Sequence, residues 1–495
     1  MGNLKIWQNG RAKTISFEGP PLLQTVLTRA GYPVDNPCGG RGVCGKCAVM
    51  LHGNVSQPNE AEQKAGTRLS CQAILLGDAE VWLADTQVNR IETLGKLTEI
   101  GNPLGQGIGA AVDIGTTTLV MELFDLKTGR SLGTAVRMNP QRSVAADVMG
   151  RIGAAMEGQG EFLQSQIREA ITRMRAEVCS AAGVKEQSID VMVVAGNTTM
   201  LYLLTGRNPD SLSHAPFEAD TLFGGEARLL DTRVYYPPCM NAFVGADITC
   251  AVLASGIHES LQTALLCDIG TNGEIALWKD GRLSVTSTAA GPAFEGAGIS
   301  CGCGSVDGAI DRVWVENGEI HLHTIGDMSA VGICGSGLID AVAAFLETEQ
   351  IDETGACETD TLPLRDEVAL LPKDIRAVQL AKAAIAAGIQ TLLETAGVSE
   401  DEISTLYIAG GFGSHLNVVS AAAIGLIPKS LQERVQVIGN GSLAGAAAIL
   451  LNQNQKALAQ KLAEESTHIN LGGNPRFNTN YMEQIRFGDK DLFDR

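Results

Sequence analysis

Ala111-Val-Asp-Ile-Gly-Thr-Thr-Thr118 is the stretch that decides the fold, because it recurs later in the chain as Leu266-Cys-Asp-Ile-Gly-Thr-Asn-Gly273. Each copy follows an apolar strand and leads into a second strand that ends at a glycine turn. A strand, a tight turn and a hairpin are therefore predicted twice. We name residues 113–118 the first aspartate turn and residues 268–273 the second aspartate turn.

Two further pairs of segments repeat in the same order. Val193-Val-Ala-Gly-Asn-Thr-Thr199 corresponds to Tyr407-Ile-Ala-Gly-Gly-Phe-Gly413, and both are typical of a buried strand that breaks at glycine and enters a helix. Phe243-Val-Gly-Ala-Asp-Ile248 corresponds to Val437-Ile-Gly-Asn-Gly-Ser-Leu-Ala-Gly-Ala446. Three markers in one order, twice, predict two similar α/β lobes, over residues 108–258 and 259–495.

The two aspartate turns are suited to phosphate binding. Their backbone N–H groups and hydroxyls can hold phosphate oxygens. We expect Asp113 and Asp268 to face one another as catalytic carboxylates, since Mg²⁺ prefers few carboxylates together with waters and phosphates. ATP with Mg²⁺ is the predicted ligand, and a purely structural duplication is the alternative. The expected nucleotide-binding residues are Gly115, Thr116, Thr117, Thr118, Gly270, Thr271, Asn272, Gly273, Gly410, Gly411, Phe412 and Gly413.

The arrangement of these repeats resembles the superfamily of acetate kinase, sugar kinases, Hsp70 and actin. That resemblance implies a two-lobe ATPase fold with a nucleotide cleft between the lobes. The chain has no Walker lysine motif, so a P-loop NTPase is not expected.

A second chemical signal lies near the N-terminus, in Cys38-Gly-Gly-Arg-Gly-Val-Cys44-Gly-Lys-Cys47 and in Cys71, with the spacing C-x5-C-x2-C-x23-C. The glycines permit turns at positive φ and a close approach of backbone N–H groups to the sulfurs. A [2Fe–2S] cluster held by Cys38, Cys44, Cys47 and Cys71 is therefore predicted. A four-cysteine zinc site, the alternative, usually contains two C-x2-C pairs, and only one is present here.

The residues around the cysteines indicate a small separate domain. Two short strands flank Gln8-Asn9-Gly10, and a helix is expected over about residues 21–30. We expect an α+β domain of the β-grasp ferredoxin type over residues 1–95, followed by a Gly/Pro-rich linker over residues 96–107. The cysteine spacing resembles the adrenodoxin-like branch of the [2Fe–2S] ferredoxins.

Several other segments carry weaker signals. Glu295, within Ala289-Ala-Gly-Pro-Ala-Phe-Glu-Gly296, is the third catalytic candidate, for positioning water or metal, and an ordinary turn carboxylate is the alternative. Residues 139–142 and 197–198 are candidates for lining the cleft, and residues 332–338 for contacting phosphate at a helix start. Cys301, Cys303 and Cys334 could approach one another, but buried structural cysteines are the simpler interpretation.

Charge and hydropathy restrict the possible partners. The net charge of −19 is uneven, since residues 1–95 carry 9 Lys/Arg and 8 Asp/Glu whereas the rest carries 28 and 48. The acidic body argues against nucleic-acid binding. Without a long apolar run or a signal segment, a cytoplasmic protein with no membrane contact is expected.

Taken in order, the ferredoxin motif, the aspartate turns, Ala-Gly-Pro-Ala-Phe-Glu-Gly and Ala-Gly-Gly-Phe-Gly resemble the reductive activators of corrinoid-dependent enzymes over nearly the whole chain. That resemblance implies ATP-dependent reduction of Co(II) to Co(I) on the corrinoid protein of a methyltransferase system, with electrons from an external low-potential donor. The chain lacks the C-terminal four-iron clusters of some relatives, and only a short linker follows its ferredoxin motif. A homodimer is among the assemblies that the sequence allows.

Three other functions stay open at this point. An activator of the 2-hydroxyacyl-CoA dehydratase type shares the ATP-binding fold but lacks this ferredoxin motif. A small-molecule kinase with an accessory cluster would need a substrate motif, and none stands out. An electron carrier whose nucleotide lobes only sense ATP is the non-enzymatic alternative.

Overall fold

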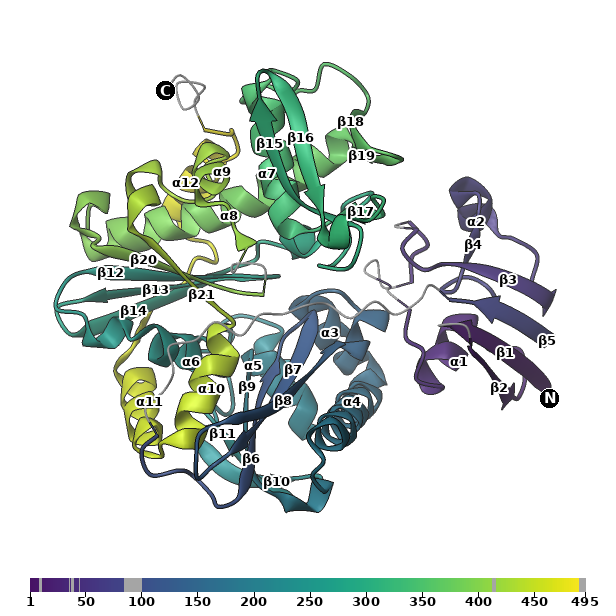
Figure 1. The fold of residues 1–495 in the computed structure, drawn as a ribbon, viewed down its shortest axis with the longest axis horizontal. Coiled ribbons are helices and arrows are strands. Elements are labelled where there is room, and N and C mark those ends of the chain that lie inside the picture. The colour runs from purple at the N-terminus through teal and green to yellow at the C-terminus, as the bar shows by residue number, and fades with distance from the viewer. Residues whose placement is uncertain are drawn as a thin grey trace.

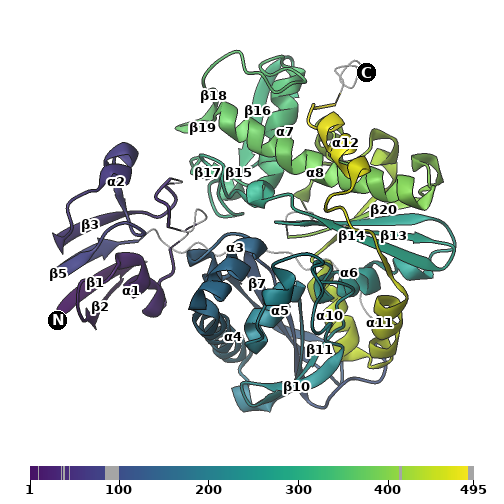
Figure 2. The same ribbon diagram turned by 180° about the vertical axis from the view of Figure 1, so that it is seen from behind.

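The computed structural model describes residues 1–8, 11–34, 36, 40–43, 45–83, 100–411 and 415–488. A small N-terminal domain lies beside two larger lobes, in both the front view and the view from behind (Figures 1 and 2). The expected fold class, a β-grasp ferredoxin domain followed by a duplicated two-lobe α/β fold, is confirmed.

The N-terminal domain is one five-stranded sheet covered by a helix, with strand order β2-β1-β5-β3-β4. Its β1 pairs antiparallel with β2 and parallel with β5, and its own core includes Leu4, Leu23 and Val81. The elements are β1 (Gly2–Gln8), β2 (Arg11–Phe17), α1 (Leu23–Arg29), β3 (Ala48–Val55), α2 (Glu60–Ala65), β4 (Arg68–Leu69) and β5 (Leu75–Trp82).

Lobe I is built on a six-stranded sheet of order β10-β11-β9-β6-β7-β8. The central strands β6 and β9 pair in parallel and are almost entirely buried, as expected for strands covered on both faces. The elements are β6 (Ile108–Ile114), β7 (Thr118–Asp125), β8 (Ser131–Met138), α3 (Val148–Ala154), α4 (Gly160–Ala182), β9 (Ile189–Gly196), α5 (Thr198–Thr205), β10 (Gly225–Leu229), β11 (Thr232–Tyr236) and α6 (Ala246–Ser255).

Lobe II repeats five strands of this sheet in the order β21-β20-β12-β13-β14, and its sixth strand, β22, pairs with β14 at the opposite edge from β10 of lobe I. Each aspartate turn joins the two strands of a hairpin, β6–β7 in lobe I and β12–β13 in lobe II. The elements of the sheet are β12 (Ala264–Ile269), β13 (Gly273–Lys279), β14 (Arg282–Thr288), β20 (Thr405–Ala409), β21 (Val435–Gly439) and β22 (Thr467–His468). The others are β15 (Ala309–Glu316), β16 (Glu319–Thr324), β17 (Gly332–Ile333), α7 (Gly335–Glu347), β18 (Leu362–Arg365), β19 (Val368–Leu370), α8 (Pro372–Ala396), α9 (Val418–Ala423), α10 (Gly441–Leu451), α11 (Asn454–Glu465) and α12 (Pro475–Glu483).

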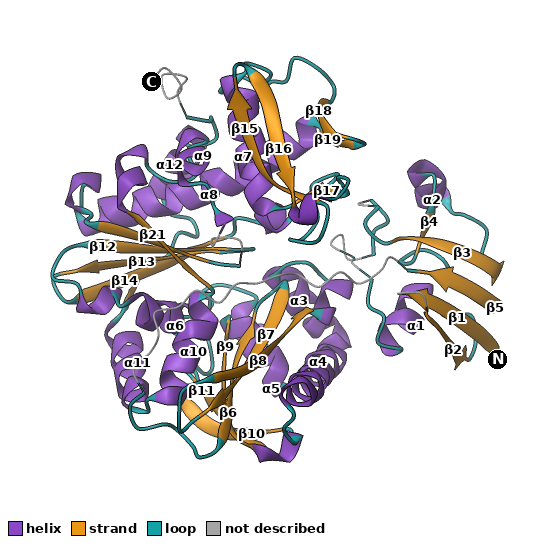
Figure 3. Cartoon of the chain, in the orientation of Figure 1, coloured by secondary structure: helices purple, strands orange, loops and turns teal. Residues whose placement is uncertain are grey.

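Helices and sheets alternate in layers (Figure 3). Helices α6, α10 and α11 lie between the two sheets, where one apolar core joins residues of both, including Val193 and Leu266. Helices α6 and α10 approach so closely that a Cβ on Gly445 would lie 2.0 Å from the carbonyl oxygen of Cys250. The two lobes therefore share a central helical layer, although α10 directly follows β21 of lobe II in the chain.

Among the helices that the structure describes, none has the length and apolar character that crossing a lipid bilayer requires.

Candidate functional site

A cavity of about 130 Å³ lies between the two lobes. It is lined by the ends of β6 and β12, by both aspartate turns, and by the starts of α6 and α10. The polar and glycine residues around it are Asp113, Gly115, Thr116, Thr117, Thr118, Asn197, Asp247, Asp268, Gly270, Thr271, Asn272, Glu274, Glu295, Gly410, Gly411, Asn440 and Ser442. Of the other expected binding residues, Gly273 is not part of this lining and packs against Ile385 instead, and Phe412 and Gly413 lie outside the described residues.

Four carboxyl groups line this cavity close together, those of the half-buried Asp113, Asp247 and Asp268 and of the buried Glu274. Asp113 accepts hydrogen bonds from Ser442 Oγ at 2.7 Å and from Asn440 Nδ2 at 2.9 Å, yet burial raises its pKa. Burial, and then the charge of Asp113, raise the pKa of Asp247 to about 7. Burial, together with Asp247, Asp113 and Glu295, raises the pKa of Asp268 to about 8. Such mutual repulsion is what a divalent cation would relieve, so the donor set fits Mg²⁺.

Glu274 carries the fourth of these carboxyl groups. It is 6% exposed, and burial raises its pKa well above the ordinary value, with further contributions from Asp247 and Asp268. In the β12–β13 hairpin Glu274 pairs directly with Asp268, which brings the two side chains to the same end of the sheet.

Each aspartate turn offers threonine hydroxyls to the cavity, whereas the amide of its first glycine is already hydrogen-bonded within the turn. The Gly115 amide donates to Thr118 O at 3.0 Å, and the Gly270 amide donates to Asn272 O at 3.0 Å, so both amides close their own turns. Glu295 Oε2 accepts hydrogen bonds from Thr117 Oγ1 and, at 2.6 Å, from Thr271 Oγ1. Because these two threonines belong to different lobes, one carboxylate bridges the cavity at the position where phosphate oxygens were expected.

An equivalent short turn supports each aspartate turn. We name residues 139–143 the first proline turn and residues 291–295 the second proline turn, since each contains a 3₁₀ segment that begins with proline after the third strand of its lobe. Asn139 donates from its backbone to Thr117 O and from Nδ2 to Gly115 O, both at 2.8 Å. The Gly291 amide donates to Thr271 O at 2.9 Å. Among the described residues that line the cavity, none belongs to 139–142, which instead lie behind the first aspartate turn.

Arg151, a residue that the sequence did not single out, is fully buried behind the first aspartate turn. Its Nη2 donates to Thr116 O at 2.5 Å and its Nε donates to Ala145 O at 3.1 Å. Burial lowers the pKa of Arg151 to about 9, so the guanidinium remains charged at neutral pH. It places a positive charge next to a turn suited to anions.

Glycines bring the strand ends close to the aspartate turns. Gly410 has a φ of +117°, and a Cβ there would lie 2.4 Å from Ile269 O. Gly196 occupies the equivalent place in lobe I, where a Cβ would lie 2.7 Å from Ile114 O. The glycine shared by the Val-Ala-Gly and Ile-Ala-Gly markers thus serves a close backbone approach.

Of the two residues that follow Gly196, Asn197 lines the cavity and Thr198 donates to Asn241 O at 2.8 Å. Within the described part of the chain the buried Nδ2 of Asn197 has no hydrogen-bond partner, which leaves a donor at the cavity. Residues 332–338 are buried at the start of α7 and do not belong to the described lining.

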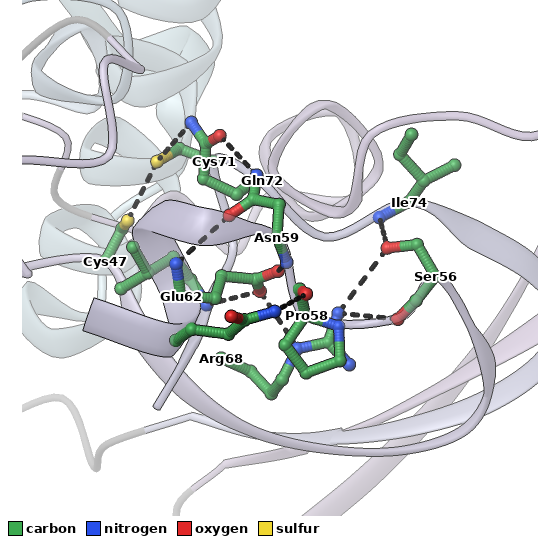
Figure 4. A network of polar contacts seen from close by, with 11 residues as sticks. Cys47, Ser56, Pro58, Asn59, Glu62, Arg68, Cys71, Gln72 and Ile74 are labelled. Atoms are coloured by element: carbon green, nitrogen blue, oxygen red, sulfur yellow. Dashed lines mark hydrogen bonds and ion pairs between the residues drawn. The ribbon is translucent and has the colours of Figure 1, made fainter. Parts of the chain in front are cut away.

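The structure describes two of the four expected cluster ligands, since Cys38 and Cys44 lie outside the described residues. Cys47 and Cys71 are buried, and their sulfurs lie 3.2 Å apart (Figure 4). The hydrogen bond with Cys47 lowers the pKa of Cys71 to about 6, against the effect of burial. A thiol that ionises this readily fits a thiolate ligand of an iron–sulfur cluster.

We name residues 38–47 the cysteine loop. A network of polar side chains holds Cys71 next to this loop (Figure 4). Gln72 Nε2 donates to Gly40 O at 2.6 Å and to Cys71 Sγ at 3.5 Å. The carboxylate of Glu62 accepts from the amides of Asn59 and Leu69 and from Arg68 Nε, at 2.9 to 3.1 Å. Burial opposes ionisation of Glu62, but Arg68 and the two amides together lower its pKa.

Sequence reasoning missed Asp247, Glu274, Asn440 and Ser442 as site residues. The repeat contained a signal for three of them, because Gly245-Ala-Asp247 and Asn440-Gly-Ser442 occupy matching helix starts. Glu274 follows the second aspartate turn directly, where a charged residue within a buried strand is unusual.

Three family profiles match the chain. The 2Fe-2S iron-sulfur cluster binding domain matches residues 7–76, the RACo middle region matches residues 108–260, and the C-terminal domain of RACo, the ASKHA domain, matches residues 262–494.

Individual relatives agree with these profiles. The corrinoid activation enzyme RamQ of Eubacterium limosum is 34% identical over 419 residues, which cover 77% of this chain and 70% of that protein. The reductase of the Co(II) methylated amine-specific corrinoid protein of Methanosarcina barkeri is 27% identical over 421 residues, 77% of each chain. A solved structure described as a reductive activator for corrinoid, iron-sulfur protein is 27% identical, with a TM-score of 0.73 and coverage of 100% of both chains.

Proposed function

Because the chain belongs to the family of reductive activators of corrinoid proteins, we propose that it is an ATP-dependent enzyme that restores a partner corrinoid protein from Co(II) to Co(I). The observation that supports this most directly is the contact between the cysteine loop and the nucleotide lobes. Lys46, which precedes Cys47, donates to Ile299 O at 2.6 Å, four residues after Glu295. An electron-carrying loop and a cavity suited to phosphates are thus neighbours in one molecule.

The cysteine loop provides the redox centre in this proposal. Cys38, Cys44, Cys47 and Cys71 hold a [2Fe–2S] cluster, which when bound supplies one electron at a time at low potential. The surrounding residues favour the ionised thiols, as the low pKa of Cys71 indicates, and Gln72 holds the loop in place through its hydrogen bond to Gly40 O. An external low-potential donor recharges the centre.

The cavity provides the nucleotide site. Asp113 and Asp268 would hold Mg²⁺, the residues of both aspartate turns would hold the phosphates, and Gly410 and Gly411 would contact the nucleoside. Arg151 adds a fixed positive charge behind Thr116. Glu295, which bridges Thr117 and Thr271 in the nucleotide-free protein, can orient a water molecule towards the terminal phosphate once the phosphates have taken up these two hydroxyls.

Nucleotide turnover has an energetic reason in such a protein. Plant-type [2Fe–2S] centres have potentials near about −400 mV. If the cobalt acceptor lies ~200 mV lower, one-electron transfer costs roughly 4.7 kcal/mol. ATP can offset that cost by favouring an arrangement of the lobes that binds and reshapes the acceptor.

The test uses the full chain with its cluster reconstituted under anaerobic conditions, a Co(II) corrinoid protein and Ti(III) citrate as the donor. We expect the Co(I) absorption spectrum to develop with MgATP and only slowly without it. Equal conversion with and without ATP would exclude an ATP-dependent activator. Asp268→Asn serves as the variant, and we expect it to retain the cluster spectrum while losing the ATP-stimulated reduction.

A further inference from the structure

The N-terminal domain is attached to lobe I at the first proline turn. Asn36, two residues before Cys38, donates from its backbone to Arg142 O and from Nδ2 to Ser143 O, both at 3.3 Å. Gln24 Nε2 also donates to Ser143 O. Both side chains are more than 90% buried. Asn36 Oδ1 meanwhile accepts from the Gly40 amide at 2.8 Å, so the same residue shapes the cysteine loop and fixes it to lobe I.

The same domain is attached to lobe II just after the second proline turn. Lys46 Nζ donates to Ile299 O at 2.6 Å and lies 3.4 Å from Ser300 O and 3.5 Å from Gly302 O. The segment that carries these oxygens is compact, because a Cβ on Gly296 would lie 2.6 Å from Cys303 O. A movement of Glu295 is therefore passed on to the oxygens that hold Lys46.

These two attachments lie at equivalent places in the repeat, and Arg173 of α4, whose Nη1 donates to Gly31 O at 3.4 Å, adds another contact between lobe I and the N-terminal domain. Each proline turn is bonded to the aspartate turn of its own lobe on one side, and the chain at its end contacts the N-terminal domain on the other. In the ribbon the N-terminal domain lies beside the same edge of both lobes (Figures 1 and 2). The domain thus spans the two lobes, and its position depends on both turns.

Nucleotide binding disturbs one of these two attachments. The cavity of about 130 Å³ is smaller than the roughly 300 Å³ at which small-molecule pockets begin. Glu295 occupies the hydroxyls of Thr117 and Thr271, and its carboxylate and a phosphate group are both anions that compete for these donors. A nucleoside triphosphate therefore requires Glu295 to give up its hydrogen bonds with Thr117 and Thr271. Asn139 is not displaced, because it donates to carbonyl oxygens of the first aspartate turn and does not occupy the hydroxyls.

We propose that phosphate binding at the aspartate turns displaces Glu295, shifts residues 296–302 and releases Lys46, so that the cysteine loop remains attached to lobe I alone. This inference rests on the nucleotide site of the proposed function. Lys46 and Glu295 act as positioning residues in it, and the ligand is a nucleoside triphosphate with its cation. The linkage is reciprocal, so weakening the Lys46 contact must strengthen nucleotide binding by the same factor.

The test measures nucleotide affinity and amide exchange on the cluster-loaded full chain, with the non-hydrolysable analogue AMPPNP and Mg²⁺. We expect AMPPNP to accelerate exchange in peptides covering residues 40–48 and 296–303 of the wild-type protein. Lys46→Ala should bind AMPPNP about fivefold more tightly, at the lower end of typical coupling energies. Lys64→Ala, the same charge change on exposed helix α2 of the same domain, should bind like the wild type.

The outcomes separate the two proposals. Saturable AMPPNP binding with unchanged exchange in both peptides, or equal affinities of the wild type and Lys46→Ala, overturns the coupling and leaves the proposed function intact. Absence of AMPPNP binding to the wild type overturns the nucleotide site itself, and the coupling with it. Normal cluster absorption of each variant shows that the substitution has not unfolded the domain.

Discussion

Single ionisable side chains determine the properties of both sites. In the N-terminal domain Glu62 is 1% exposed and accepts three hydrogen bonds, which fix α2 against β4 just before Cys71. A buried carboxylate of this kind stabilises the fold only while all its partners remain. The integrity of the cluster site therefore depends on a residue that is not a ligand.

Replacing Glu62 by Gln removes the charge that Arg68 and the two amides hold, and should lower the free energy of unfolding of the domain by about 2 kcal/mol. Loss of cluster absorbance during urea titration measures this, and Glu60→Gln, at an exposed position of the same helix, is the control. Because the pKa of Glu62 is lowered from 4.5, its stabilisation exists above pH 4.5 and disappears as the pH falls through the folded value. A Glu62→Gln variant as stable as the wild type at neutral pH would contradict this role.

The carboxyl groups of the cavity show the opposite behaviour. With pKa values of about 7 and about 8, Asp247 is partly protonated and Asp268 mostly protonated in the metal-free protein near neutral pH. Mg²⁺ needs the ionised form, so its binding must release protons. The affinity for MgATP should rise by up to about tenfold per pH unit for each proton released, up to about pH 8, and then level off.

Calorimetry in buffers of different ionisation enthalpy measures that proton release. We expect it to decrease in Asp268→Asn, because the amide cannot titrate. An affinity that is independent of pH between about pH 6 and about pH 8 would show that these carboxyl groups do not bind the cation.

At the scale of elements, the site is positioned by the repeated hairpins and by the strands β9 and β20, which pair in parallel with β6 and β12. Strand β20 ends beside β12 just as β9 ends beside β6, and glycine lies at both ends. A Cβ atom on any other residue at position 410 would lie 2.4 Å from Ile269 O, too close for a normal contact. The close packing of these strand ends therefore depends on the absence of a side chain at the glycines.

Gly410→Ala should lower the stability of lobe II by about 2 kcal/mol, because alanine is strained at a φ of +117° and collides with Ile269 O. Gly411→Ala is the matched control, since a Cβ there meets no atom of the described residues within 4 Å, and should stay within about 0.5 kcal/mol of the wild type. Chemical denaturation monitored by far-UV circular dichroism compares the two. Equal destabilisation of both variants would mean that the close approach is unimportant.

The sequence could predict these elements because their signals are local. The Asp-Ile-Gly-Thr turns and the strands before them each lie within a few residues, and the helix expected over about residues 21–30 is present as α1 (Leu23–Arg29). It could not predict that α10 packs between the two sheets or that Arg151 lies behind Thr116, because those contacts join distant segments. The first proline turn was expected to line the cleft, but its asparagine side chain supports the aspartate turn from behind.

At the scale of the whole molecule, the two lobes are joined by their shared core, by the hydrogen bonds that Asn440 and Ser442 donate to Asp113, and by Glu295. The shared core is apolar and joins both sheets, whereas Glu295 is the polar bridge between Thr117 and Thr271. A bridge that must open for each nucleotide and can then orient water has a direct influence on turnover.

Glu295→Gln should slow ATP hydrolysis by about 10²- to 10⁴-fold, because the amide cannot accept a proton from water. The affinity for MgATP should be equal or higher, since a neutral side chain competes less with phosphate for the two threonines. Steady-state hydrolysis and equilibrium binding, measured with the corrinoid partner present, provide both numbers. Unchanged hydrolysis would reduce Glu295 to an ordinary turn carboxylate.

The backbone contact between Gly445 and Cys250 has a mechanical consequence. Helices α6 and α10 touch at this glycine and cannot move closer together. Any rotation of one sheet against the other would therefore turn about this contact. The N-terminal domain lies at the far side of the molecule from this point (Figure 1). A rotation of one sheet against the other about this contact would therefore displace the N-terminal domain further than it displaces the residues next to the contact.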